Sequence, residues 1–123
     1  MTSDTSDPRS FLPVKPIVLD ILVVLATEEL HGWGIVKALK ARAGGRATIL
    51  PGNLYRTLKS MLAQGLIEES EERPDPEEDD ERRRYYRVST LGRAVVREEA
   101  KRLDETLRAA RDADLVPEYP GEG

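Results

Sequence analysis

Cysteine is absent from this sequence of 123 residues, and histidine and tryptophan occur once each. The absence of cysteine excludes disulfides, thiol catalysis and thiolate metal sites. The single histidine, His31, leaves little room for a histidine-based metal site or a serine–histidine–aspartate triad. We therefore expect no metal and no cofactor. We also expect no enzymatic activity, because no acid–base–nucleophile arrangement is evident.

Long apolar runs are lacking as well. The longest, residues 21–26, is far shorter than the run of about 18 residues that a membrane-spanning helix needs. The N-terminus, MTSDTSDPRS, has no basic start followed by an apolar segment, so we expect no signal peptide. With 39% hydrophobic residues the chain is unlike a disordered protein, and its length suits one domain with its own core. These features fit a cytoplasmic protein that does not enter membranes.

Acidic residues outnumber basic ones, but the two are unevenly distributed. The net charge of −4 is unfavourable for a nucleic-acid-binding protein. Residues 68–81, however, hold ten acidic residues and one basic residue, whereas residues 9–67 hold eight basic and three acidic ones. Four more arginines follow, Arg82, Arg83, Arg84 and Arg87. Because local charge decides whether a surface attracts phosphate, residues 9–67 remain a candidate nucleic-acid-binding segment.

Short helices are predicted for the first half of the chain. The first begins at Pro16, whose fixed φ suits a first helical position, and it is apolar on nearly every side. It is either a central core helix or a helix whose second side meets a partner chain. The second follows a turn at residues 31–34 and places Ile35, Val36 and Leu39 inward.

The third helix opens at Pro51 and ends at residues 64–65. A short glycine-containing connection joins it to the second helix, which is typical of a helix-turn-helix. Trp33 and Tyr86 are predicted to be core residues. The apolar residues of the third helix recur at helical spacing: Leu54, Leu58, Met61 and Leu62.

Two short strands are predicted next, at residues 66–70 and 82–88. The segment between them contains Pro74 and Pro76 and almost no apolar residue, so it is predicted to be a solvated loop. Two strands after a helix-turn-helix form a winged helix. The predicted fold class is therefore mainly α with a small β-hairpin, a winged helix-turn-helix followed by a C-terminal dimerisation helix.

The C-terminal helix is predicted from about residue 90 to 113, with Ser89 as its cap. A helix of about six turns with a single apolar stripe is unstable alone in water, so the stripe must be covered. Packing within the same chain is one alternative, and we favour contact with a second copy. The predicted dimerisation residues lie on the first and last helices: Ile17, Ile21, Leu91, Val95, Leu103 and Leu107.

The order of several motifs resembles the PadR family of bacterial transcriptional regulators over residues 14–112. In that family a His-Gly-Tyr-x-Ile segment, a Pro-Gly-x-Leu-Tyr helix start, Gly-Leu-Ile, an Arg-x-Tyr-Tyr strand and a Gly-Arg helix start follow one another. Here Trp33 replaces the tyrosine, Leu50 stands where a Ser or Thr cap is frequent, and the wing loop is unusually acidic. The matching segments are His31-Gly32-Trp33-Gly34-Ile35, Leu50-Pro51-Gly52-Asn53-Leu54-Tyr55, Gly65-Leu66-Ile67, Arg83-Arg84-Tyr85-Tyr86 and Gly92-Arg93.

The resemblance implies a sequence-specific DNA-binding repressor that forms a homodimer on a palindromic or near-palindromic operator. It also implies a small-molecule effector, of unknown identity, sensed between the subunits near the first and last helices. The alternative is a winged-helix protein-interaction module that does not bind DNA. The corresponding divisions are a flexible N-terminal arm at 1–14, a winged-helix DNA-binding domain at 15–88, a dimerisation helix at 89–114 and a tail at 115–123.

The third helix of a winged helix enters the major groove, so its outer face supplies the candidate DNA contacts. Arg56 can pair with guanine and Asn53 with adenine, whereas Lys59 and Ser60 suit phosphates. Tyr55 is either a contact at the DNA surface or a half-buried packing residue. The arginines at 82–84 either reach DNA or pair with the acidic residues at 77–81. The full candidate set is Asn53, Tyr55, Arg56, Thr57, Lys59, Ser60, Arg82, Arg83 and Arg84.

Overall fold

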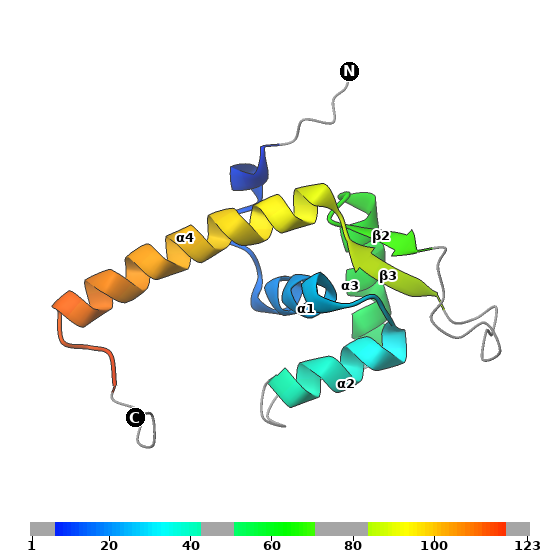
Figure 1. Cartoon of the computed structure of the whole chain (residues 1–123), viewed down its shortest axis with the longest axis horizontal. Helices are drawn as coiled ribbons and strands as arrows, with labels where there is room; N and C mark the ends of the chain where they lie inside the picture. Colours follow the sequence, from blue (N-terminus) through cyan, green and yellow to red (C-terminus); the bar gives the residue numbers. More distant parts are fainter. Residues whose placement is uncertain (1–6, 43–50, 71–83, 118–123) are drawn as a thin grey trace.

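The computed structural model describes residues 7–42, 51–70 and 84–117, and it is mainly helical with one small sheet (Figure 1). Within these ranges, no helix has the length and apolar character needed to cross a membrane. The elements, in chain order, are η1 (Pro8–Phe11), α1 (Pro16–Thr27), β1 (Leu30–His31), α2 (Gly32–Arg42), α3 (Pro51–Ala63), β2 (Ile67–Ser70), β3 (Tyr85–Val88) and α4 (Thr90–Asp112).

The sheet has three antiparallel strands in the order β1-β3-β2, one more than the predicted hairpin. β1 pairs with β3, so His31 lies opposite Tyr85. The predicted turn at residues 31–34 is wrong, because His31 belongs to β1 and α2 begins at Gly32. The backbone N–H of Gly34 donates to Nδ1 of His31 over 3.1 Å, so the imidazole caps the helix directly after the strand.

The hydrophobic core surrounds α1, which contacts α2, α4 and β3 (Figure 1). Ile21 and Leu22 of α1 are completely buried, and Leu25 is nearly so. The interpretation of α1 as a central core helix is confirmed. The residues predicted to face inward on α2 and α3 are also buried, apart from Leu62, which is partly buried: Ile35, Val36, Leu39, Leu54, Leu58 and Met61.

The start of α4 is fixed against the end of α3 by Ser89. Its hydroxyl accepts the N–H of Gly92 over 2.9 Å, which confirms the predicted cap. The same hydroxyl donates to the carbonyl oxygen of Gly65 over 2.5 Å. Gly65 ends α3 with φ of +79°, a backbone conformation that glycine adopts without steric cost. The position of α4 is thereby coupled to that of α3.

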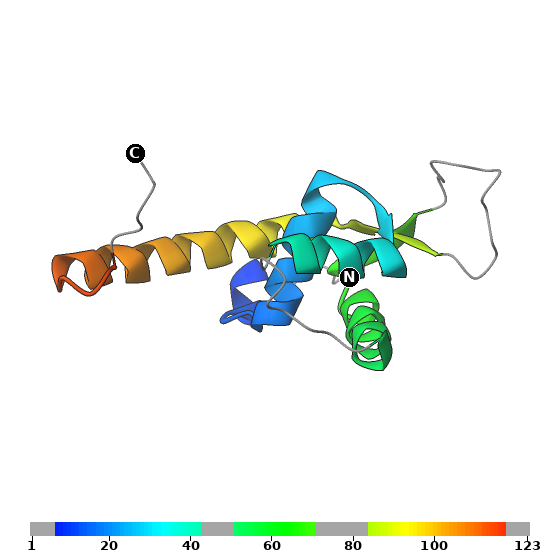
Figure 2. The ribbon, with the colours of Figure 1, turned by 90° about the horizontal axis from the view of Figure 1, so that it is seen from below.

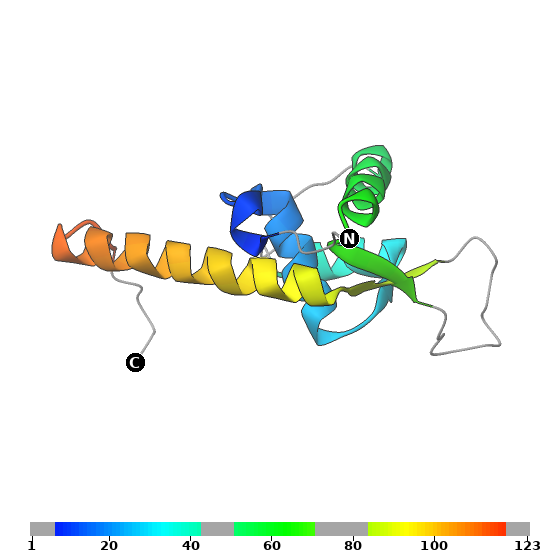
Figure 3. The same cartoon turned by 90° about the horizontal axis from the view of Figure 1, so that it is seen from above.

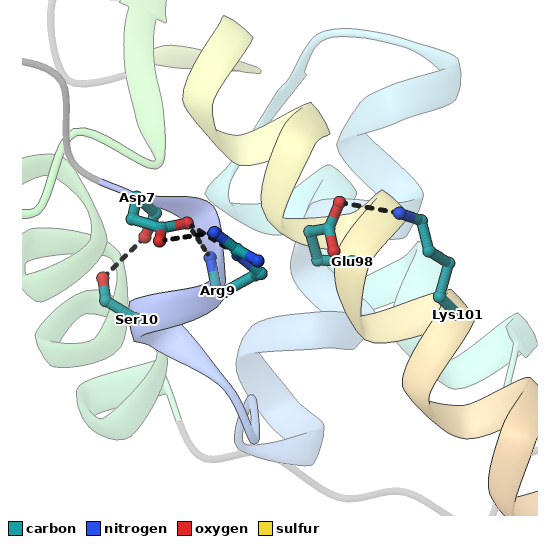
Figure 4. Close-up of polar contacts among 5 residues, drawn as sticks. All are labelled: Asp7, Arg9, Ser10, Glu98 and Lys101. Atoms are coloured by element: carbon teal, nitrogen blue, oxygen red, sulfur yellow. Dashed lines mark hydrogen bonds and ion pairs between the residues drawn. The ribbon is translucent and has the colours of Figure 1, made fainter.

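Residues 7–14 pack against α4, although the sequence assigned them to a flexible arm. The η1 helix contacts α4, and Phe11 and Val14 pack against the core. Figure 4 shows Arg9 between its partner Asp7 and Glu98 of α4. A loose arm is therefore wrong for residues 7–14, because their apolar side chains gain burial there. The remaining arm residues, 1–6, lie outside the described residues.

The attachment of this segment includes a buried carboxylate, Glu99 of α4, whose side chain is only 1% exposed. Glu99 accepts the N–H of Val14 over 2.9 Å and is paired with Arg102, whose Nη2 lies 3.1 Å away. By helical spacing Glu99 lies between Val95 and Leu103, so it interrupts the apolar stripe of α4. Hydrogen bonding by Arg102 lowers the pKa of Glu99 despite its burial, and the N–H of Val14 lowers it further.

We expect Glu99→Gln to lower the free energy of unfolding by about 1–3 kcal/mol, because the amide leaves the buried polar groups imperfectly paired. The matched control Glu98→Gln changes a more exposed glutamate paired with Lys101, and it should cost less than about 1 kcal/mol. Urea denaturation at pH 7 measures both. Since the pKa of Glu99 is lowered in the folded protein, the wild type should have the higher free energy of unfolding at any pH above the ordinary glutamate pKa. This advantage over Glu99→Gln should disappear as the pH falls through the lowered pKa of Glu99. Equal losses for the two variants would contradict a special role for Glu99.

Candidate nucleic-acid interface

Helix α3 projects from one side of the body, as Figures 2 and 3 show. Its buried residues Leu54, Leu58 and Met61 recur at helical spacing, so the opposite side of the helix faces solvent. The predicted contact residues lie on that side or along its edges. Thr57 is half-buried, and the others on α3 are exposed: Asn53, Tyr55, Arg56, Lys59 and Ser60.

The exposed charge of α2 and α3 has one sign. Neither helix contains an acidic residue, whereas they carry five basic ones between them: Lys37, Lys40, Arg42, Arg56 and Lys59. Arg42 is paired with Asp20 of α1 over 3.2 Å. The other four form no ion pair with any residue that the structure describes. These unpaired cations suit a phosphate backbone.

The wing strands present arginines that are already paired. Arg84 lies 3.3 Å from Glu69, and Arg87 lies 3.1 Å from Glu68, its direct neighbour across the sheet. The predicted pairing of wing arginines with acids therefore occurs for Arg84, but its partner is on β2. The residues at 82 and 83, and the acidic loop residues at 77–81, lie outside the described residues. All four paired groups are well exposed, so each pair contributes little to stability.

Tyr55 is both exposed and in contact with a neighbouring helix, and its contact with DNA stays a prediction. Its ring is 55% exposed, yet it lies against the start of α2. A Cβ atom added to Gly32 would be 2.8 Å from the Tyr55 hydroxyl oxygen, so a side chain at that position would collide with the ring. Glycine at position 32 thus lets α2 and α3 approach closely beside the exposed surface of α3.

The prediction of Trp33 as a core residue is wrong, since its side chain is 60% exposed. The inward positions of α2 are taken by Ile35, Val36 and Leu39, which leaves Trp33 on the outer side. Lys37, one turn further, places its Nζ atom 5.8 Å from the centre of the indole ring. The sequence signal for this exposed pair was the four-residue spacing of Trp33 and Lys37, which puts both on one helix face.

The predicted dimerisation residues divide into two groups. Ile21 and Val95 are completely buried within the chain, so they are unavailable to a partner and this part of the prediction is wrong. Ile17 and Leu91 are partly buried against the same core. By contrast, Leu103 is 43% exposed and Leu107 is 40% exposed. Both belong to the second half of α4. The C-terminal part of this helix extends beyond the rest of the body (Figures 1 and 3).

A small cavity of about 200 Å³ lies where the N-terminal segment, α1 and the end of α3 meet. Its apolar lining includes Phe11, Val18 and Val95, and its polar lining includes Ser60 of α3 and Gln64, which directly follows that helix. The cavity thus adjoins both α4 and the helix that carries the candidate DNA contacts.

Comparison with known proteins identifies the family. Residues 21–98 match the family described as "Transcriptional regulator PadR-like family". The "Transcriptional regulator Rv3488" of Mycobacterium tuberculosis is 39% identical over 90 residues, which cover 73% of this chain and 78% of that protein. The matched family consists of transcriptional regulators, which confirms the expectation that the chain is not an enzyme.

Two solved structures share the fold. A PadR family transcription regulator from Clostridium difficile superimposes with a TM-score of 0.58 at 23% identity, covering 76% of this chain and 95% of that one. Bacillus subtilis PadR, solved in complex with operator DNA, gives a TM-score of 0.57 at 20% identity and covers 70% of this chain and 46% of that one. The predicted winged-helix fold class and the resemblance to PadR regulators are confirmed.

Proposed function

Because this chain belongs to the PadR-like family of transcriptional regulators, we propose that it binds operator DNA in the cytoplasm and represses transcription. Helix α3 enters the major groove, with Arg56 and Asn53 reading base edges and Lys59 and Ser60 contacting phosphates. The observation that carries the proposal is the exposed face of α2 and α3, which holds basic residues and no acidic one. Bacillus subtilis PadR, with the same fold, is a protein solved on operator DNA.

Two substitutions on α3 test this proposal because they should weaken DNA binding in different ways. Arg56→Ala should cost about 1–3 kcal/mol on the operator and relax the preference at one base position. Lys59→Ala should weaken all sequences about equally and reduce the salt slope by about one. Titrations of operator and random-sequence duplexes at two salt concentrations measure both effects, after the operator has been captured from genomic DNA.

The same titrations can contradict the assignment. Equal, sequence-independent losses for both variants would make Arg56 a phosphate contact only. Duplex affinity that does not fall with rising salt would instead favour the alternative, a winged-helix module that binds a protein partner, because phosphate contacts require a steep salt dependence.

The active species in this proposal is a homodimer joined along the exposed part of α4. Leu103 and Leu107 are half-exposed leucines one turn apart on a helix section that the body leaves uncovered. A second copy would cover them and would place two α3 helices on successive half-sites of a palindromic operator.

Relief of repression by a small molecule is the final part of the proposal. The cavity beside Val18 and Val95 is the place where an effector would act, because Ser60 at its edge belongs to α3 and Gln64 directly follows that helix. A ligand filling it would bias the position of α3 relative to α4, if it binds the two arrangements with different affinity.

A further inference from the structure

The exposed indole of Trp33 has no role in the interface described so far. Large apolar side chains that stay exposed are informative, because burial of such a ring is strongly favourable. Trp33 is 60% exposed on the first turn of α2. With Lys37 and Lys40 it follows i, i+4, i+7 spacing, and all three residues are exposed, so they form one outward face of the helix.

This face adjoins the candidate DNA surface. Gly32, the neighbour of Trp33, lies directly under the ring of Tyr55 on α3. Figure 2 shows the first turn of α2 beside α3, with α3 projecting from the body. Trp33, the exposed residue after Gly32, therefore lies near the point where α2 meets Tyr55, the exposed neighbour of Arg56 on α3.

Charge decides which partner this face fits. The cations nearest to Trp33 in the helix, Lys37 and Lys40, have no ion-pair partner among the described residues, and α2 contains no acidic residue. A protein partner would need a compensating acidic surface, whereas duplex DNA supplies phosphates in register beside any groove that α3 enters. The contact of the start of α2 with α3 and the uniform sign of charge both favour DNA.

We propose that Trp33 and Lys37 extend the DNA interface onto α2 by contacting the sugar–phosphate backbone next to the groove occupied by α3. The indole packs against a deoxyribose and donates its N–H to a phosphate, while the ammonium group of Lys37 contacts a neighbouring phosphate. These contacts strengthen binding to every sequence and carry no base preference. The inference rests on the proposed DNA-binding function and adds the backbone contact of α2 to it.

Trp33 is the sole tryptophan of the chain, so its fluorescence reports on this position alone. Addition of duplex DNA to the wild-type protein should quench or shift its emission. Trp33→Ala should weaken operator and random-sequence duplexes alike, by roughly five- to tenfold, because part of the indole surface is no longer buried. Trp33→Phe should retain most of the affinity.

Lys37→Gln should reduce the salt slope by about one. Its matched control is Lys101→Gln, which removes an exposed lysine from α4, remote from α2, and should leave the slope unchanged. Unchanged Trp33 emission at saturating DNA would overturn the proposal, even if the duplex binds. If Trp33→Ala binds duplex DNA as tightly as the wild type does, the proposal is overturned as well.

The proposed DNA-binding function and the proposed α2 contact can be overturned separately. Duplex binding and a relaxed sequence preference of Arg56→Ala, with no change in Trp33 emission, would support the proposed function and overturn the α2 contact. If the wild type binds no duplex at all, both are overturned.

Discussion

Changing Leu103 and Leu107 together to glutamate should convert the protein from a dimer into a monomer. Both side chains are about two-fifths exposed on the second half of α4, where the proposed second copy would cover them. Placing two carboxylates per chain in that apolar contact should cost several kcal/mol per dimer. Light scattering at tens of micromolar protein measures the change of mass.

A leucine outside the stripe provides the control. Leu115 is 74% exposed and lies beyond the end of α4, so Leu115→Glu makes the same chemical change without entering the proposed contact. It should leave the dimer intact. A wild-type monomer, or a double variant that remains dimeric, would show that the contact is wrongly assigned.

Loss of the dimer should also weaken operator binding far more than random-sequence binding. A dimer gains its affinity for a palindrome by binding two half-sites at once, and a monomer forfeits the second. Comparing the double variant with Leu115→Glu on both duplexes therefore links the α4 contact to sequence-specific recognition.

Gly92→Ala should destabilise the fold by about 2–4 kcal/mol, a large effect for one added methyl group. A Cβ atom at this position would collide with the backbone carbonyl oxygen of Leu66 and would lie 2.8 Å from Cγ2 of Val88. Backbone atoms cannot move aside cheaply, so α4 would have to shift away from the sheet. Chemical denaturation measures the loss in free energy of unfolding.

Gly34→Ala is the matched control, because it adds the same methyl group to a helix. Its Cβ would come closest to the flexible end of the Leu30 side chain, at 3.2 Å, and would make ordinary contacts with Leu30 Cβ and His31 Cε1. Alanine also favours the helical conformation. We expect a change within about 1 kcal/mol. Similar losses at both positions would contradict the view that the contact of Gly92 with Leu66 holds α4 in place.

Local chemistry in the sequence was sufficient to place most helix starts and the buried face of α3. Proline at positions 16 and 51 and the cap at Ser89 mark helix starts through interactions within one turn. Leu54 and Leu58 show their burial through spacing alone. The candidate DNA-contact face of α3 followed directly, since it is the side opposite to these leucines.

Contacts between distant parts of the chain decided the features that the sequence did not predict. A two-residue strand such as β1 has no periodic signal and exists only because β3 offers it a hydrogen-bonding edge. Glu99 resembles its polar neighbours in sequence, yet it is buried because Val14, 85 positions away, donates to it. Trp33 is exposed because other residues of α2 already fill the inward positions.

The sequence by itself predicted an apolar stripe along α4, but it did not determine which part of that stripe the chain's own core covers. Helical spacing marks Val95 and Leu103 as members of the same stripe, because periodicity records only direction around the helix axis. The tertiary structure separates them: Val95 is buried by the chain's own core, while Leu103 lies beyond its reach. A partner can contact only the residue that the body leaves exposed. The point along α4 at which the body ends is set by packing between distant segments of the chain.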